Sequence, residues 1–209
     1  KLAELSQLLG DLGFAFSGSG DTWGGVVPVT DTKLQGAIAE YRKSGLNVMM
    51  SMKEAGKPIS FVEDCAVALP DLAEYTQGLT DIFTKHGTKG TWYAHASVGC
   101  LHVRPAQNLK DPDDIALVRR IAEETHDVVR DYGGTHSGEH GDGILRSEFL
   151  ESMLGRRMTR AYAEVKRTFD PAGIMNPGKI VDAPEMDDPR LVRDGPGYDD
   201  GRAARALPV

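Results

Sequence analysis

The sequence GTWYAHASVGCLHVRP, residues 90–105, predicts a β-hairpin in the middle of this 209-residue chain. Aromatic and β-branched residues are typical of strands, and Val98-Gly99 is suited to a two-residue turn. With that turn, His95 lies directly across from His102. Facing residues of a hairpin have Cβ atoms about 4.5–5.5 Å apart, so the two imidazoles could share one metal ion. The alternative is a surface hairpin whose two histidines are incidental.

A second stretch, THSGEHGDGILRSEFL at residues 135–150, combines glycines with histidines and acids. Glycine allows positive φ and close approach to a ligand, so this pattern predicts a shaped loop. Two histidines and one carboxylate form an open site for zinc, manganese or iron(II), which makes Glu139 the predicted third ligand. His140 could then act as a general base, because imidazole titrates near neutral pH; alternatively, it only hydrogen bonds within the turn. Three further polar residues are expected to position the loop: His136, Asp142 and Arg146.

The segments on either side of these two stretches predict an α+β fold with a mainly antiparallel sheet covered by helices. We expect one domain over residues 1–181 and an extended tail over residues 182–209, which is rich in Pro, Asp, Gly and Arg. Lys1 opens directly into a helical pattern, which predicts a fragment of a larger protein. The predicted helices cover residues 2–12, 33–50, 72–87, 111–134 and 147–169. Further strands cover residues 26–30 and 59–69, the second broken by the acids Glu63 and Asp64.

Composition excludes several classes of protein. A net charge of −7 with a pI near 5.4 argues against nucleic-acid binding, which usually needs a basic surface. No apolar run approaches the roughly 18 residues that a transmembrane helix needs. Cys65 and Cys100 are too few for a disulfide framework or an iron–sulfur cluster. A reducing, cytoplasmic location follows, with peripheral association to the inner membrane left open.

Several cations could bind an acidic substrate. Arg42 and Lys57 flank the bend KEAGKP, and Arg104 follows His102 by two residues, on the same strand face. A guanidinium can hold a carboxylate through two hydrogen bonds, although exposed cations without such a role are common. His86 and His126, on predicted helices with charged neighbours, are expected to be solvated.

The segment FDPAGIMNPGKIV, residues 169–181, contains two X-Pro turns. Asn176 in this segment could reach a partner, and a purely structural turn is the alternative.

Three motifs in this order resemble the C-terminal, substrate-binding domain of FAD-linked oxidases of the vanillyl-alcohol-oxidase type. They are HASVGCLHVRP (residues 95–105), SGEHGDGILRSEF (residues 137–149) and FDPAGIMNPGKIV. The resemblance covers roughly residues 37–182. The family includes dehydrogenases of D-lactate and D-2-hydroxyglutarate and the glycolate oxidase flavin subunit. HASVGCLHVRP is most similar to long bacterial members fused to an iron–sulfur domain.

The resemblance implies a ferredoxin-like cap domain that oxidises a D-2-hydroxy acid to a 2-oxo acid, with hydride transfer to FAD held mainly by a domain absent from this chain. The implied partners are that FAD-binding domain of the same polypeptide, a small anionic hydroxy acid and, in fused members, an iron–sulfur domain. The implied roles are a divalent metal (Zn, Mn or Fe) on His95, His102 and Glu139, a catalytic base at His140, carboxylate binding by Arg42 and Lys57, and contact of Asn176 with the flavin-bearing domain.

The sequence departs from the family pattern at two places. The family often has Asn where this chain has Arg104, and Gly-Asp-Gly-Asn where it has residues 97–100, SVGC. Arg104 indicates a more anionic substrate. Two other functions stay open: a flavin-independent metal hydrolase, and a non-catalytic docking domain.

Overall fold

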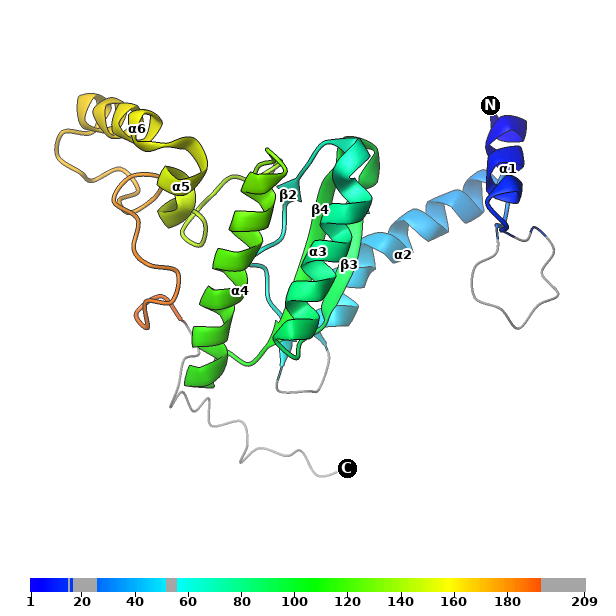
Figure 1. Ribbon diagram of the computed structural model, residues 1–209, viewed down its shortest axis with the longest axis horizontal. Helices are drawn as coiled ribbons and strands as arrows, with labels where there is room; N and C mark the ends of the chain where they lie inside the picture. Colours follow the sequence, from blue (N-terminus) through cyan, green and yellow to red (C-terminus); the bar gives the residue numbers. More distant parts are fainter. Residues whose placement is uncertain (15, 17–25, 52–55, 193–209) are drawn as a thin grey trace. The chain divides into compact units, whose positions relative to one another are not determined.

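The computed structural model describes residues 1–14, 16, 26–51 and 56–192 (Figure 1). The chain divides into two compact units, residues 1–51 and 52–209, and each is described by itself. The first unit contains α1 (Leu2–Asp11) and α2 (Thr32–Met50). Asp31 accepts a hydrogen bond from the backbone amide of Leu34 at 2.7 Å, which caps α2 as its sequence predicts. The strand predicted at residues 26–30 does not form.

The second unit has the predicted α+β architecture, with a sheet whose strand pairs are all antiparallel. β4 is central: β3 pairs with one of its edges, and β1 and β2 pair with the other. α3 and α4 lie side by side over the sheet (Figure 1). The elements are β1 (Lys57–Pro58), β2 (Cys65–Ala66), α3 (Leu72–Lys85), β3 (Gly90–His95), β4 (Cys100–Gln107), α4 (Pro112–Asp131), α5 (Leu150–Leu154) and α6 (Arg156–Phe169).

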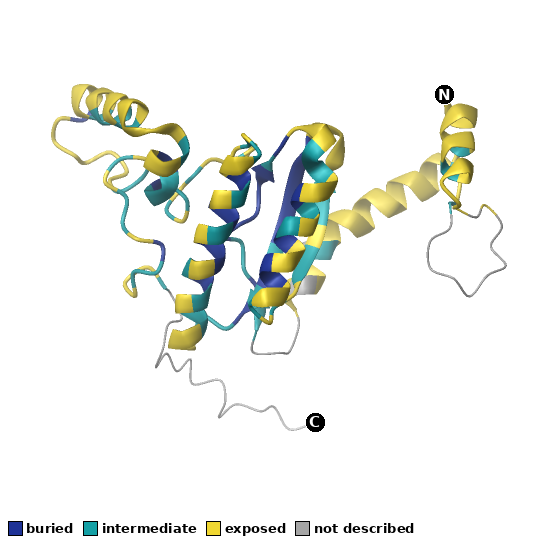
Figure 2. Ribbon diagram, in the orientation of Figure 1, coloured by how far each residue is buried: buried dark blue, intermediate teal, exposed yellow. Residues whose placement is uncertain are grey.

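The alternation of residue types along β4 separates the core from the polar face. Leu101 and Val103 are buried in the hydrophobic core together with the inner sides of α3 and α4 (Figure 2). Side chains alternate along a strand, so His102 and Arg104 point to the opposite face. The sequence CLHVRP therefore builds the core with one set of residues and a polar cluster with the other.

α4 shows why this arrangement is stable. Asp111 caps the helix by accepting from the amide of Asp113 at 2.9 Å, and Pro112 occupies the first turn, where its missing N–H costs nothing. Ile121 and Val129 lie on the inner face and are fully buried. Burial of each such side chain contributes about 1.5–3 kcal/mol, so the apolar stripe of α4 fixes the helix against the sheet.

Of the strand predicted over residues 59–69 and broken by two acids, only the part after the acids forms a strand, the short β2. β1 and β2 are two residues each, and they pair with opposite ends of β4. Between them the chain turns at Asp64, whose φ is +76°. The backbone amide of Asp64 donates to the carbonyl of Leu101 at 2.8 Å, so the bend stays beside β4. The turn lies at the two acids that were expected to break the strand, Glu63 and Asp64.

The predicted hairpin exists, but its register is wrong. His95 pairs with Cys100, and His102 pairs with Tyr93, because the connection is a 3₁₀ turn followed by Gly99 rather than a two-residue turn. Gly99 has φ +73°, and a Cβ there would lie 2.0 Å from the carbonyl oxygen of Val67. This close approach requires glycine.

Part of the segment predicted as an extended tail packs on the second unit. Met186 is buried in the core, and its amide donates to Glu148 at 2.6 Å. Asp187 forms an ion pair with Arg119 at 2.8 Å. Residues 193–209 lie outside the described residues. Within the described part of the chain, no helix has the length and apolar character needed to span a bilayer.

Candidate active site

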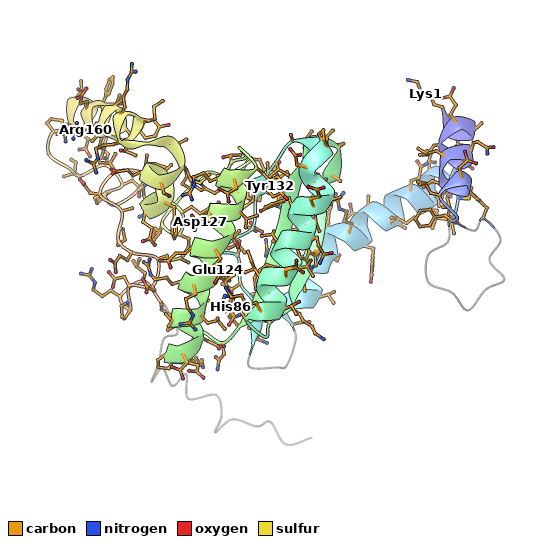
Figure 3. All side chains as sticks on the ribbon, in the orientation of Figure 1. Lys1, His86, Glu124, Asp127, Tyr132 and Arg160 are labelled. Atoms are coloured by element: carbon orange, nitrogen blue, oxygen red, sulfur yellow. The ribbon has the colours of Figure 1, made fainter. Side chains whose placement is uncertain are left out.

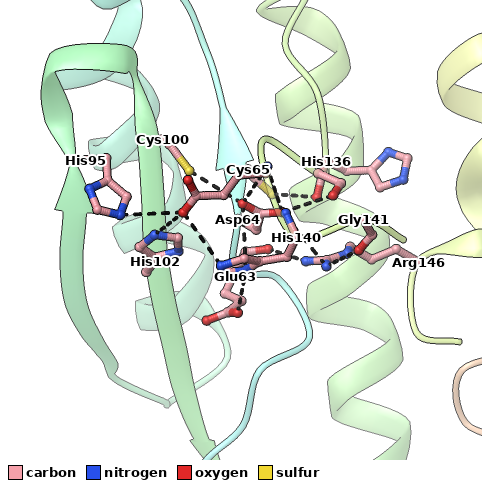
Figure 4. Close-up of polar contacts among 12 residues, drawn as sticks. Glu63, Asp64, Cys65, His95, Cys100, His102, His136, His140, Gly141 and Arg146 are labelled. Atoms are coloured by element: carbon pink, nitrogen blue, oxygen red, sulfur yellow. Dashed lines mark hydrogen bonds and ion pairs between the residues drawn. The ribbon is translucent and has the colours of Figure 1, made fainter. Parts of the chain in front are cut away.

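Three imidazoles surround one carboxylate oxygen, Oε1 of Glu139. Its distance is 3.0 Å to Nε2 of His102, 3.5 Å to Nε2 of His95 and 3.6 Å to Nε2 of His140. The rings of His102 and His140 are stacked, and His95 stands edge-on to His102, with ring centroids 5.1 Å apart in both pairs. Figure 4 shows these side chains converging from the β3–β4 hairpin and from the loop that follows α4. The structure thus brings together four residues that the sequence places in one site.

The corrected hairpin register still allows the two hairpin histidines to meet. Because His95 pairs with Cys100, it is the diagonal neighbour of His102 on the same face of the sheet. Diagonal neighbours in a sheet are within reach of long or aromatic side chains. The proximity of the imidazoles therefore comes from a different geometry than the one predicted.

The donor set fits a divalent metal ion. Metal–ligand bonds of about 2.0–2.2 Å at tetrahedral or right angles place ligand atoms roughly 3.0–3.5 Å apart, close to the separations around Glu139. Candidate ligand atoms of Asp64, His102, Glu139 and His140 all lie within 4.8 Å of one another. His102 is almost fully buried, and burial lowers its pKa, which favours the neutral imidazole that metals bind.

Asp64, which the sequence analysis did not single out, holds the loop of Glu139 and His140 in place. Its carboxylate accepts hydrogen bonds from the amide of Glu139 at 3.0 Å, the amide of His140 at 2.8 Å and the hydroxyl of Ser137 at 2.9 Å. Its carbonyl accepts from the amide of Gly138 at 2.6 Å. Burial raises the pKa of Asp64, but these hydrogen bonds lower it more, so the net pKa lies below its usual value. Both oxygens of Asp64 are therefore engaged by the loop.

Glu63, also missed from the sequence, connects Arg104 to His140. Its Oε2 accepts from Nε and Nη2 of Arg104 at 2.9 and 2.8 Å, and its Oε1 lies 3.2 Å from Nδ1 of His140. Arg104 also donates to the hydroxyl of Tyr93 at 3.3 Å. Arg104 is thus next to the histidine cluster, as its strand position predicts, and bound to a buried carboxylate. Two adjacent acids within the apolar run FVEDCAV were the signal that could have revealed this role.

The remaining polar residues of the loop stabilise it through contacts outside the histidine cluster. Nε2 of His136 is 2.6 Å from the carboxylate of Asp142. Arg146 donates to the carbonyl of Glu63 at 2.7 Å and to the carbonyl of Gly141 at 2.5 Å. The contacts to Asp142 and Gly141 lie within the loop, and the one to Glu63 ties the loop to the bend that carries both buried acids, in agreement with the positioning role expected from the sequence.

The expectation that His86 and His126 are solvated is wrong. His86, at the end of α3, contacts Glu124 of α4 at 2.9 Å (Figure 3). His126 is 3% exposed, packs on Phe149 with ring centroids 4.0 Å apart, and has no hydrogen-bond partner at either ring nitrogen among the described residues. Charged neighbours along the sequence suggested exposure, but His126 lies on the inner stripe of α4.

The burial of His126 predicts acid sensitivity. Desolvation, aided by the charges of His136 and Arg146 and opposed by Asp142, lowers the pKa of His126 to about 3. The unfolded chain takes up this proton near pH 6.5. Stability is therefore fully present above pH 6.5 and falls by up to about 1.4 kcal/mol per pH unit below it. The free energy of unfolding is measured with urea at several pH values from about pH 8 to about pH 4. His126→Met should make this free energy fall less steeply with decreasing pH than in the wild type. An equally steep fall in both proteins would show that His126 is not the cause.

The other predicted site residues lie away from the histidine cluster or in the other unit. Lys57 pairs with Gln107 on β4, five residues beyond His102, which corresponds to about 17 Å along the strand. Asn176 is exposed, with φ +46°, in the turn after α6. Arg42 belongs to α2 of the first unit.

The sequence was compared with the models of known protein families. The family described as "FAD linked oxidases, C-terminal domain" matches residues 7–180. The chain belongs to this family.

Named relatives of this FAD linked oxidase C-terminal domain agree with the family match. D-2-hydroxyglutarate dehydrogenase of Escherichia coli is 34% identical over 154 residues, which is 74% of this chain and 15% of that protein. The enzyme of the same name from Pseudomonas putida is 37% identical over 143 residues, 68% of this chain and 14% of that protein. Glycolate oxidase subunit GlcD of Bacillus subtilis is 30% identical over 144 residues, 69% of this chain and 30% of that protein. The chain thus spans less than a third of each of these relatives.

A cavity of about 280 Å³ adjoins the histidine cluster of this FAD linked oxidase C-terminal domain. Glu139 lines it together with His136, Asp142 and the apolar side chains of Leu150 and Met153. Glu139 therefore belongs both to the histidine cluster and to the wall of this cavity.

Proposed function

We propose that this chain is the substrate-binding and catalytic cap of an FAD-dependent dehydrogenase that oxidises a D-2-hydroxy acid to a 2-oxo acid. The observation that carries the proposal is the convergence of His95, His102 and His140 on the carboxylate of Glu139. The names of the relatives support the substrate class: D-2-hydroxyglutarate dehydrogenases, a glycolate oxidase subunit and D-lactate dehydrogenases.

His95, His102 and Glu139 would hold the divalent metal, which is zinc, manganese or iron. Asp64 is not assigned as a ligand, because its two oxygens already accept hydrogen bonds from the loop. A bound ion would supply Lewis acidity toward the substrate's hydroxyl and carboxylate oxygens. The buried His102 provides the fixed, neutral ligand, whereas His95 is half exposed and leaves one side of the site open.

His140 is the proposed base that takes the hydroxyl proton of the substrate. Its Nε2 faces the Glu139 carboxylate, so a substrate bound beside Glu139 would place its hydroxyl near this nitrogen. Arg42 and Lys57 are proposed to bind the substrate's carboxylate, as the family resemblance implies. Arg104 is proposed to add positive charge at the site, which would favour a more anionic acid.

A bound flavin supplies the acceptor for the hydride that leaves C2 of the substrate. We propose that FAD is bound mainly by another domain of the same polypeptide, and that Asn176 contacts that domain. An iron–sulfur domain in the same polypeptide is proposed as a further partner on the basis of the motif HASVGCLHVRP.

The metal assignment predicts a result in elemental analysis. The protein should bind one equivalent of zinc, manganese or iron, and His102→Ala should lose it, because His102 is the most buried donor. His86→Ala is the matched control, since His86 also contacts a glutamate but lies outside the cluster. Retention of the metal by His102→Ala would reject the assignment.

The reaction is tested with the flavin-containing protein under anaerobic conditions. D-Lactate, D-2-hydroxyglutarate and glycolate are added in turn, and bleaching of the oxidised flavin absorbance is recorded. Reduction by at least one of them, prevented by a chelator and restored by the metal, supports the proposed function. Absence of reduction by all three would contradict it, and turnover of an ester or amide without flavin would favour a hydrolase.

A further inference from the structure

The imidazole of His140 has two different environments. Nδ1 lies 3.2 Å from Oε1 of Glu63, whereas Nε2 lies 3.6 Å from Oε1 of Glu139 in the histidine cluster. The backbone amide of His140 donates to Asp64 at 2.8 Å, which fixes the point from which the ring extends. The Nδ1 side of the ring therefore faces Glu63, and the Nε2 side faces Glu139, beside which the substrate is proposed to bind.

Glu63 is suited to control this ring because it is buried and itself held. It is 5% exposed, and the guanidinium of Arg104 donates to its Oε2 through two nitrogens. Arg104 is anchored in turn by the Tyr93 hydroxyl and lies 6.0 Å from the Tyr93 ring centroid. Two charge-assisted hydrogen bonds to the same oxygen, Oε2, fix one end of the Glu63 carboxylate. The second oxygen of Glu63 is thereby directed at His140.

The chemistry of these groups selects one tautomer. A carboxylate offers only acceptors, so the ring nitrogen within hydrogen-bond distance of one carries the proton in a neutral imidazole. Nδ1 is 3.2 Å from Oε1 of Glu63, whereas Nε2 is 3.6 Å from Oε1 of Glu139, which is beyond that distance. The other nitrogen then presents its lone pair. A partner on one ring nitrogen sets the state of the other in this way in many histidine sites.

We propose that Glu63, held by Arg104, is a positioning residue that keeps the proton of neutral His140 on Nδ1 and so leaves Nε2 as the proton acceptor. This inference rests on the proposed function only for the use made of Nε2. It gives Arg104 a defined role through Glu63, whose carboxylate offsets the charge of the guanidinium.

Glu63→Gln provides a sharp test because the variant is isosteric. Arg104 has only donors, so the single oxygen of the glutamine amide must face Arg104. The NH₂ group is then directed at Nδ1 of His140, which must accept, and the proton moves to Nε2. Glu148→Gln is the matched control: Glu148 is another largely buried carboxylate bound by an arginine, Arg119, at 2.9 Å, and it lies outside the cluster.

The tautomer is read from long-range ¹H–¹⁵N correlation spectra of the full chain, labelled at its six histidines and kept metal-free with EDTA at a pH where imidazole is neutral. We expect a protonated Nδ1 and an unprotonated Nε2 for His140 in the wild type and in Glu148→Gln, and the reverse in Glu63→Gln. The same tautomer in wild type and Glu63→Gln would overturn the proposal, as would a protonated Nε2 in the wild type.

Kinetics of the flavin-containing enzyme give a second readout that separates the two proposals. Glu63→Gln should lower kcat by about 10²-fold, the lower end of what a general base contributes, with little change in KM. Suppose that the tautomer of His140 differs between the wild type and Glu63→Gln, but the wild type oxidises no hydroxy acid. That result would reject the proposed function and leave the positioning role of Glu63 intact. Wild-type oxidation with an unchanged tautomer in Glu63→Gln would reject the positioning role alone.

Discussion

Replacement of His140 by glutamine is expected to lower kcat for hydroxy-acid oxidation by about 10³-fold, within the range that a general base contributes. Glutamine retains a polar side chain of similar reach but cannot take a proton at neutral pH. The side chain of His140 is 45% exposed, so the substitution should change the free energy of unfolding by less than about 1 kcal/mol. The measurement is stopped-flow reduction of the flavin together with chemical denaturation of the same samples.

The control for this prediction is His86→Gln. His86 also lies beside a glutamate, Glu124 at 2.9 Å, but on the helical layer outside the cluster, so its replacement should leave the reduction rate unchanged. Metal content decides between two roles for His140. Full metal occupancy in His140→Gln agrees with a base, whereas loss of the metal would identify His140 as a ligand and remove it from proton transfer.

The sequence was sufficient to find the main chemical groups of the candidate site. The alternation along the strand predicted Arg104 on the same face as His102, and Arg104 lies next to the histidine cluster through Glu63. The glycine-rich stretch 135–150 was expected to be a loop, and it is irregular up to Ser147. These features are determined by residues close together in the sequence, so local sequence patterns are enough to predict them.

The sequence failed where contacts between distant segments decide the structure. The turn at Val98-Gly99 was misassigned because the close approach of Gly99 to Val67 cannot be read from local propensities. Glu63 and Asp64 were expected only to break a strand, and the contacts of their side chains were missed. Their bend is stabilised by amides more than 70 residues away, at Glu139 and His140, and no local pattern contains that information.

Asp64→Ala is expected to destabilise the second unit by about 3–5 kcal/mol, because it leaves several buried donors without their charged acceptor. The residue is fully buried and has φ +76°, where alanine is strained as well. The amides of Glu139 and His140 and the hydroxyl of Ser137 lose their partner together. We therefore expect loss of bound metal at denaturant concentrations well below global unfolding, because the loop that carries Glu139 is released first.

Asp64→Asn separates the charge from the backbone conformation. Asparagine tolerates positive φ and keeps one acceptor oxygen, so it should lose roughly half of the stability that alanine loses. Hydrogen exchange at the amides of Glu139 and His140 measures the loop directly. Protection should fall from wild type to Asp64→Asn and further to Asp64→Ala, while amides in the centre of α4 change only with global stability. Equal protection of both loop amides in all three proteins would show that Asp64 does not hold the loop, and that the positions of Glu139 and His140 have another cause.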